Sequence, residues 1–214
     1  MKALKALFLT LFIYSCAFSL DEGKDYLVLQ QPFSNAQNSV TEVFSYGCIH
    51  CFNQHKQNTL ALLKQKLPNL SYKAYPVKQM ASYGNEFANL YAYASYKDSQ
   101  SNLDVTDSKS LMHKINDAYF TAYFERRMTW NDGKNPKAFY ELGLKILGID
   151  YNTLQNFLVS KEGKEILSSF DKALEPAKNT GTPAFIVNGK YQVLLNNITS
   201  LEQFIKVIEE LSKK

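Results

Sequence analysis

Two cysteines separated by two residues, Cys48 and Cys51, lie where a strand-like run of the sequence changes into a helical pattern. The run 40–45 is rich in β-branched and aromatic residues and is broken by Gly47, whereas the stretch 49–66 repeats leucine at helical spacing. A sulfur at a helix N-terminus lies beside unpaired backbone N–H groups and the positive end of the helix dipole, and both stabilise a thiolate. We therefore expect Cys48 to be the exposed attacking sulfur and Cys51 to be the buried resolving sulfur.

The residue before Cys51 adds to this chemistry. His50 carries an imidazole that stabilises a neighbouring thiolate when it is protonated or donates a hydrogen bond. A stabilised thiolate at Cys48 favours the dithiol form of the pair, which makes the disulfide form a better oxidant. The four residues 48–51 therefore predict a redox-active pair.

The spacing of the two cysteines also allows other interpretations. A structural zinc ion takes about four ligands, but the chain has no second cysteine pair and only His50, His55 and His113 as nitrogen donors. Covalent haem attachment needs a histidine directly after the second cysteine, where this chain has Phe52. An inert structural disulfide fits the spacing and stays open. We expect no metal and no bound cofactor.

The first 19 residues have the layout of a secretory signal peptide. Two lysines lie near the start, an apolar run follows over residues 6–14, and Ala17 and Ser19 occupy the small-residue positions before a cut at Leu20. The apolar run is short for a membrane span, so a retained anchor is the weaker interpretation. We expect an exported protein that is soluble after cleavage.

Export changes the interpretation of the cysteines. If Cys16 leaves with the signal peptide, the mature chain keeps only Cys48 and Cys51. A disulfide framework in an exported protein normally uses more cysteines at wider spacing, so one close pair indicates redox work. Lipid anchoring at Cys16 is a minor alternative.

Charge and composition exclude other classes of function. The mature chain would hold 22 basic and 20 acidic residues without a basic stripe, so we expect no binding to nucleic acid. Apolar residues make up 45% of the chain and charged residues 21%, a balance typical of a folded globular protein.

Secondary-structure patterns divide the mature chain into three parts. Strand-like runs occur near both ends, over residues 26–30, 40–45, 70–77, 184–187 and 191–195. The middle carries only helical patterns, over residues 86–96, 110–128, 136–147, 150–158 and 160–178. Asn188-Gly189 predicts a tight hairpin between the last two strands, and Thr199 is the predicted cap of a final helix.

This order of elements predicts an α/β fold with a mixed central sheet flanked by helices. The sheet-forming region is split into residues 20–77 and 180–214. An all-helical insertion, residues 78–179, separates the two parts, and its aromatic stripes are typical of a core formed by helices packed on helices.

Residues 42–51, 182–191 and 21–26 are three separate stretches that carry a resemblance to a known family. Together they resemble the DsbA family of bacterial periplasmic thiol-disulfide oxidoreductases. Residues 42–51 resemble the family's strand leading into a Cys-x-His-Cys site, and residues 182–191 are similar to its cis-proline strand and hairpin. Residues 21–26 resemble the start of the mature protein. The resemblance spans the mature chain and implies a thioredoxin fold, a low pKa for Cys48 and a periplasmic location.

The resemblance also implies roles for three further residues. Pro183 would be the cis-proline facing the disulfide, and the backbone of Thr182 would pair with a substrate chain. Glu42 corresponds to the family's buried acid and would relay the proton of Cys51. Its alternation with Val40 and Phe44 on an apolar stripe supports burial, while an exposed glutamate at a strand edge stays open.

Two departures from the family's pattern stand out. The residues between the cysteines are Ile49-His50, where the best-known members have Pro-His, so the redox strength of the pair would differ somewhat. The lysine that partners the buried acid is replaced, because Ala74 aligns best with it. Lys73 would point to the opposite face of its strand, and we assign it no role.

These features predict an exported dithiol oxidase that introduces disulfide bonds into newly translocated proteins through Cys48 and Cys51. The resemblance implies that reduced protein clients are its substrates and that a DsbB-like, quinone-linked membrane oxidase reoxidises it. We expect a monomer. A disulfide isomerase or reductase on the same fold is one alternative, and a peptide-binding, chaperone-like module is another.

Overall fold

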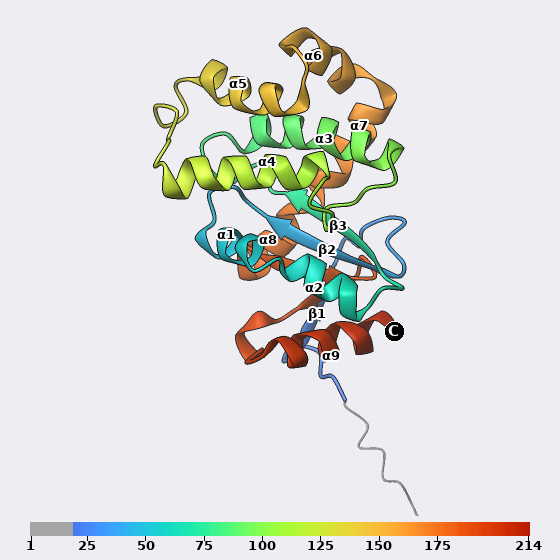
Figure 1. Cartoon of the computed structure of the whole chain (residues 1–214). Coiled ribbons are helices and arrows are strands. Elements are labelled where there is room, and N and C mark those ends of the chain that lie inside the picture. The colour runs from blue at the N-terminus through green and yellow to red at the C-terminus, as the bar shows by residue number, and fades with distance from the viewer. Residues whose placement is uncertain (1–18) are drawn as a thin grey trace, which may run out of the picture.

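A computed structural model describes residues 19–214 of the 214-residue chain (Figure 1). Apart from Ser19, the predicted signal peptide lies outside the described residues, as does Cys16. The described residues form a five-stranded sheet in the order β1-β5-β4-β2-β3. Its strands are β1 (Tyr26–Val28), β2 (Ser39–Phe44), β3 (Ser71–Pro76), β4 (Ala184–Val187) and β5 (Tyr191–Val193). Strands β2 and β3 are parallel and the other pairs are antiparallel, so the predicted mixed sheet is confirmed.

Helices fill the long interval between β3 and β4. Figure 1 shows α3 to α7 gathered as a block on one side of the strands, with α9 on the opposite side near β1. The helices before and after β3 are α1 (Ile49–Lys56), α2 (Thr59–Lys66), α3 (Gly84–Gln100), α4 (Leu111–Phe120), α5 (Pro136–Leu147), α6 (Tyr151–Val159), α7 (Lys161–Asp171), α8 (Leu174–Thr180) and α9 (Leu201–Ser212). A π turn, η1 (Thr121–Glu125), extends α4, and a 3-10 turn, η2 (Leu195–Asn197), precedes α9. No helix of residues 19–214 has the length and apolar character that crossing a membrane requires.

Strand β2 lies at the centre of the sheet and buries both of its faces. Val40 and Phe44 belong to the larger core, which includes the rings of α3 and α4. Val43, on the opposite face, packs in a smaller core with Ala184 and Ile186 of β4. Side chains alternate between the faces of a strand, so Glu42 shares the face of Val40 and Phe44. This alternation directs the carboxyl group toward the helices that cover the larger core.

Several local predictions agree with the structure. The Asn188-Gly189 turn has φ values of 54° and 66°, the left-handed pair that a tight hairpin between right-twisted strands requires. Gly148 ends α5 with a φ of 66°. The Asp150 side chain accepts the backbone N–H of Thr153 at 2.7 Å and so caps α6.

Two of the predicted helices are each divided into two. The stretch 49–66 breaks because Asn58 adopts a left-handed conformation with a φ of 52°, which asparagine tolerates better than most residues. The stretch 160–178 breaks between α7 and α8. Pro176 cannot lie inside a long helix, because it lacks an N–H group and clashes with the preceding turn, but the first turn of α8 accommodates it.

The predicted cap of the last helix is wrong by one residue. Ser200, not Thr199, is the N-cap of α9, and its hydroxyl accepts the backbone N–H of Gln203 at 3.2 Å. Thr199 lies just outside the helix, where its own N–H donates to the Gln203 side-chain oxygen at 2.9 Å. Serine and threonine are both good caps, so the sequence preference did not distinguish the two positions.

Candidate active site

The two cysteines lie at the start of α1, directly beyond the end of β2. Cys48 is the N-cap residue in an extended conformation, and the Cys51 N–H donates to the Cys48 sulfur at 3.3 Å. Gly47 allows this turn to pack closely, because a Cβ atom there would lie 2.8 Å from the Cβ of Ala81. The sequence therefore places the first sulfur at the helix N-terminus, as expected.

The two sulfurs differ in exposure. Both cysteines are free thiols in this structure, with Cys48 partly exposed and Cys51 only 1% exposed. Because an attacking sulfur has to meet its partner in solution, the exposures agree with the order expected from the sequence. Cys51 can react only with what reaches it from inside the site.

A loop from the far end of the chain completes the site. The Thr182–Pro183 peptide bond is cis, and the Cys48 thiol donates to the Thr182 carbonyl oxygen at 3.1 Å. That contact requires a protonated sulfur. When Cys48 is a thiolate, the Thr182 side chain, through its hydroxyl, can donate to it. The fold therefore brings Thr182 and Pro183 beside Cys48 across most of the chain length.

Hydrogen bonds lower the pKa of Cys48 to about 5. The largest cause is the hydrogen bond from the Cys51 side chain, followed among the lowering causes by the Thr182 side chain and then by the backbone N–H groups of Cys51 and His50. Partial burial of Cys48 acts in the opposite direction. Cys48 is therefore largely a thiolate at neutral pH.

The pKa of Cys51 moves the other way. Burial is the largest cause, followed by the hydrogen bond to Cys48 and by the negative charge of Glu42, and together they raise the pKa far above its usual range. A thiolate at Cys51 is therefore a high-energy species that takes up a proton as soon as a donor is within reach.

His50 lies on the exposed side of α1. Its backbone N–H group is one of the causes that lower the pKa of Cys48. Within residues 19–214, its imidazole makes no hydrogen bond. Stabilisation of the thiolate by the His50 ring therefore stays a prediction, while the backbone contribution follows from the position of His50 in the first turn.

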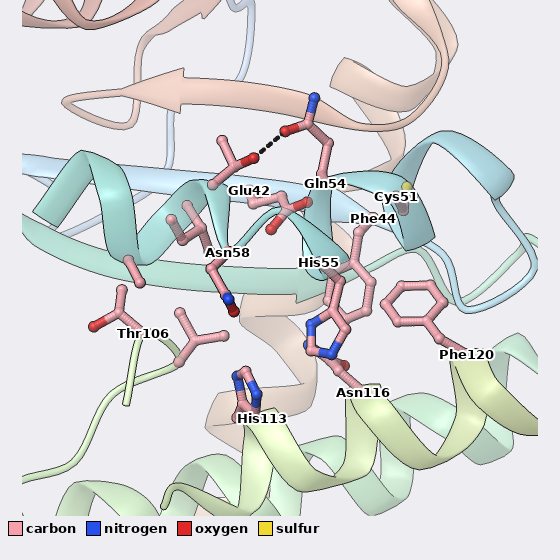
Figure 2. A pocket seen from close by; sticks show the side chains of 14 residues that line it. Glu42, Phe44, Cys51, Gln54, His55, Asn58, Thr106, His113, Asn116 and Phe120 are labelled. Atoms are coloured by element: carbon pink, nitrogen blue, oxygen red, sulfur yellow. Dashed lines mark hydrogen bonds between the residues drawn. The ribbon is translucent and has the colours of Figure 1, made fainter. Parts of the chain in front are cut away.

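Glu42 lies in β2 beneath α1 and lines a small cavity together with Cys51 (Figure 2). Burial is the main cause that raises the pKa of this carboxyl to about 8, and the nearby charge of Cys48 adds to it. Strand β2 is flanked by β4 and β3, so the alternative of a glutamate at a strand edge is wrong. At neutral pH, Glu42 is largely a neutral acid that can donate a proton.

The pairing of β2 with β3 accounts for the missing lysine. Glu42 lies opposite Ala74, and Lys73 lies opposite Thr41. The Lys73 ammonium group donates to the Asn35 carbonyl oxygen at 3.2 Å, on the other face of the sheet. The expectation that Lys73 faces away from the acid is confirmed.

The polar residues that line the rest of the cavity were not predicted from the sequence. His55 and Gln54 extend from α1, while His113 and Asn116 extend from α4 (Figure 2). One signal was available, because His55 follows Cys51 by four residues and so shares its face of the helix. Nothing in the sequence pairs α4 with α1. Among residues 19–214, no three His, Cys, Asp or Glu side chains converge as a metal site requires.

The fold and the paired cysteines define the class of this protein as a thioredoxin-fold thiol-disulfide oxidoreductase. Residues 39–209 match the family model of the DSBA-like thioredoxin domain. The chain belongs to this family, as the resemblance in the sequence implied.

Relatives and solved structures agree with this assignment. The chain is 30% identical to the thiol:disulfide interchange protein DsbL of Lelliottia amnigena over 92% of this chain and 89% of that protein. It is 28% identical to DsbA of Salmonella typhimurium over 83% and 78% of the two chains. The crystal structure of DsbL from Salmonella enterica serovar Typhimurium superposes with a TM-score of 0.85 at 31% identity, covering 92% of this chain and all of that one. The structure of reduced DsbL gives a TM-score of 0.83 at 29% identity, over 91% of this chain and all of that one.

Proposed function

We propose that the protein is a dithiol oxidase that introduces disulfide bonds into newly translocated proteins. The observation that carries the proposal is that the pKa values of the two sulfurs shift in opposite directions. The site lowers the pKa of Cys48 to about 5 and raises that of Cys51. A stable thiolate at Cys48 favours the dithiol form over the disulfide form, so the disulfide gives up its oxidising equivalents readily.

The reaction then has two exchange steps. A client thiolate attacks the Cys48 sulfur, the Cys48–Cys51 bond breaks, and its electron pair moves to Cys51, which takes the proton of Glu42. A second client thiolate attacks the client sulfur of the mixed disulfide, and Cys48 leaves as a thiolate. The client loses two electrons and gains one disulfide, while Cys48 and Cys51 become the dithiol.

The loop at Thr182 and Pro183 is our proposed client-binding element. Its position supports this role, because the Thr182 carbonyl lies 3.1 Å from the attacking sulfur. A client chain that pairs with the Thr182 backbone would bring its own cysteine in line with Cys48. Main-chain pairing suits an enzyme with many clients, since every client sequence offers the same backbone groups.

We also propose the location, the oligomeric state and the redox partner of the enzyme. We place it in the periplasm after removal of residues 1–19, acting as a monomer on reduced secreted proteins. A DsbB-like quinone-linked membrane oxidase would reoxidise it. Within the mature chain, residues 20–77 and 180–214 would form the thioredoxin-like domain, with residues 78–179 as its helical insertion. The names of the relatives, thiol:disulfide interchange proteins, support the exchange activity of the proposed oxidase.

Two measurements on the purified protein test the oxidase proposal. The first is the equilibrium of the Cys48–Cys51 pair with reduced and oxidised glutathione. The second is a denaturation curve for each redox form at pH 7. We expect the dithiol form to be the more stable one, because only it holds the stabilised thiolate. A disulfide form that is more stable than the dithiol form would refute a strong oxidase and favour a reductase.

A further inference from the structure

The cavity beside Cys51 contains two imidazoles that the exchange steps do not use (Figure 2). Its volume is about 30 Å³, above the roughly 10–15 Å³ that one water molecule needs. Glu42 of β2 and Cys51 of α1 lie in its wall together with His55 of α1 and His113 of α4. The residues that line it from α2, and the loop before α4, carry no titratable group. Water can therefore stand between the acid and the histidines.

His55 connects this cavity to the surface. Its side chain is only 13% exposed, and its Nε2 atom lies 3.6 Å from the carboxylate of Asp117, which is 69% exposed. The ring of His113 lies beside it, with the two ring centroids 4.8 Å apart. Asp117 and His113 both belong to α4. The order from solvent inward is therefore Asp117, the imidazole pair, the cavity and Glu42.

Unpartnered polar atoms show that the inner part of this region suits water. The Tyr91 hydroxyl and the Asn116 side-chain oxygen are buried; the Asn116 side chain interacts with Tyr91, but neither atom has a hydrogen-bond partner of good geometry within residues 19–214. Asn116 lines the cavity, and the charge of Glu42 is one cause that raises the pKa of Tyr91. Buried polar atoms are normally satisfied, and a water molecule can supply the missing bonds.

We propose that His55 and His113 are the proton-exchange relay between solvent and Glu42. This inference rests on the proposed function, because it starts from Cys51 leaving the disulfide as a thiolate. One proton passes from the Glu42 carboxyl group to Cys51. In the same step, Glu42 takes a proton from cavity water, the water takes one from His55, and the imidazole pair regains its proton from solvent beside Asp117, so the relay contributes to the rate at which the disulfide is reduced. Both histidines are positioning residues that act through Glu42.

The chemistry of a neutral imidazole fits this task. Burial and the neighbouring His113 lower the pKa of His55, while Asp117 acts in the opposite direction. A neutral ring accepts a proton on one nitrogen and releases one from the other, so it can pass protons inward or outward. No lysine from β3 reaches Glu42, since Ala74 lies opposite it. The histidine pair is therefore the basic group that this chain offers to the acid from the cavity side.

The test uses His55→Gln and His113→Gln, since glutamine keeps hydrogen-bonding capacity and does not titrate. The oxidised full-length mature protein reacts with a synthetic peptide that carries two cysteines, from pH 5.5 to 8.5. Acid quenching, thiol alkylation and mass analysis then give the rate at which the Cys48–Cys51 disulfide is reduced. We expect each variant to be slowed about tenfold, with a flatter pH profile than the wild-type protein. Added free imidazole should restore most of the rate, because the Asp117 carboxylate beside His55 is exposed to solvent.

The control is Thr106→Ser, which trims one methyl group from the wall of the same cavity and keeps the hydroxyl that bonds to Asp104. It should react at the wild-type rate. The glutathione equilibrium should be the same for all four proteins, because a relay changes rates and not end states. A wild-type rate in both histidine variants overturns the relay, and so does a loss that keeps the wild-type pH profile and is not rescued by imidazole.

Two further outcomes of the experiment also have a defined meaning. If one histidine variant fails to fold, the other variant still tests the relay, and so does the solvent isotope effect on the wild-type rate. A wild-type rate that is equal in light and heavy water would overturn the relay. If the wild-type protein itself does not oxidise the peptide, the proposed function fails and the relay with it. A wild-type protein that oxidises the peptide alongside unaffected histidine variants refutes the relay alone.

Discussion

Cys48 caps the N-terminus of α1 and Cys51 lies in its first turn, yet the fold gives their sulfurs opposite surroundings. Cys48 faces backbone N–H groups and the Thr182 loop, and its pKa falls to about 5. Cys51 faces the core and the carboxyl group of Glu42, and its pKa rises. The residue type is the same, so the difference comes from burial and from the hydrogen bonds that each position offers.

These different surroundings explain why two cysteines separated by two residues react in a fixed order. The exposed sulfur is the good leaving group toward the client, whereas the buried sulfur needs a proton when it leaves. The helix N-terminus supplies the first property and the acid in β2 supplies the second. An exchange centre built in this way needs one helix end and one buried carboxyl group.

The largest expected effect separates the two sulfurs. Cys48→Ser should reduce disulfide exchange by at least about a thousandfold, because the nucleophile is lost. Cys51→Ser should still attack a disulfide-bonded peptide, and the mixed disulfide through Cys48 should accumulate because no resolving sulfur remains. Mass analysis after alkylation measures both products. A mixed disulfide that forms through Cys51 in the Cys48→Ser protein would show that the assigned order of attack is reversed.

The next effect concerns the acid that serves the buried sulfur. Glu42→Gln should slow reduction of the Cys48–Cys51 disulfide about a hundredfold below pH 8, since the proton donor to Cys51 is lost. The wild-type rate should fall as the pH rises through about 8, where Glu42 ionises. Lys73→Gln is the control, because Lys73 occupies the other face of the sheet next to Asn35. Equal rates for Glu42→Gln and wild type would remove Glu42 from the mechanism.

The same substitution should alter stability in a pH-dependent way. Burial raises the pKa of Glu42 from 4.5 to about 8, so the wild-type protein loses stability as the pH rises from 4.5 through 8, where the unfolded chain releases the proton more easily. Glu42→Gln removes this loss. At pH 9 we expect its free energy of unfolding to exceed that of the wild type by about 5 kcal/mol, relative to their difference at pH 4. Urea denaturation of the dithiol form measures it, and a difference that does not change with pH would contradict a buried acid.

The smallest expected effect concerns the imidazole ring of His50, near the exposed sulfur of Cys48. His50→Gln keeps the backbone N–H group that contributes to the low pKa of Cys48 and removes only the ring. We expect the pKa of Cys48 to rise by less than about one unit. The ultraviolet absorbance of the thiolate across a pH titration measures this change. An unchanged pKa would show that the helix terminus, Cys51 and Thr182 determine it without the imidazole.

Much of this architecture could be predicted from the chain because its signals are local. The strand 184–187, the Asn188-Gly189 turn and the ends of α5 depend on residues that are neighbours in the sequence. The same holds for Cys48 as the cap of α1 and for Glu42 on the apolar side of β2. The shift of the last cap to Ser200 was missed because Thr199 and Ser200 both satisfy the local preference. The break at Asn58 was missed because its left-handed conformation interrupts an otherwise helical pattern.

The sequence by itself determined which residues are able to react, while tertiary structure decided what surrounds them. The order of the sulfurs follows from their positions in a single helical turn. The contact of Cys48 with Thr182 and the meeting of His55 with His113 depend on packing between distant segments. A helical or strand pattern reports only which face of an element is buried, and not which element covers it. The Cys-x-x-Cys motif, the acid and the loop could therefore be recognised in the chain, but their contacts with the sulfurs and the cavity beside Cys51 required the fold.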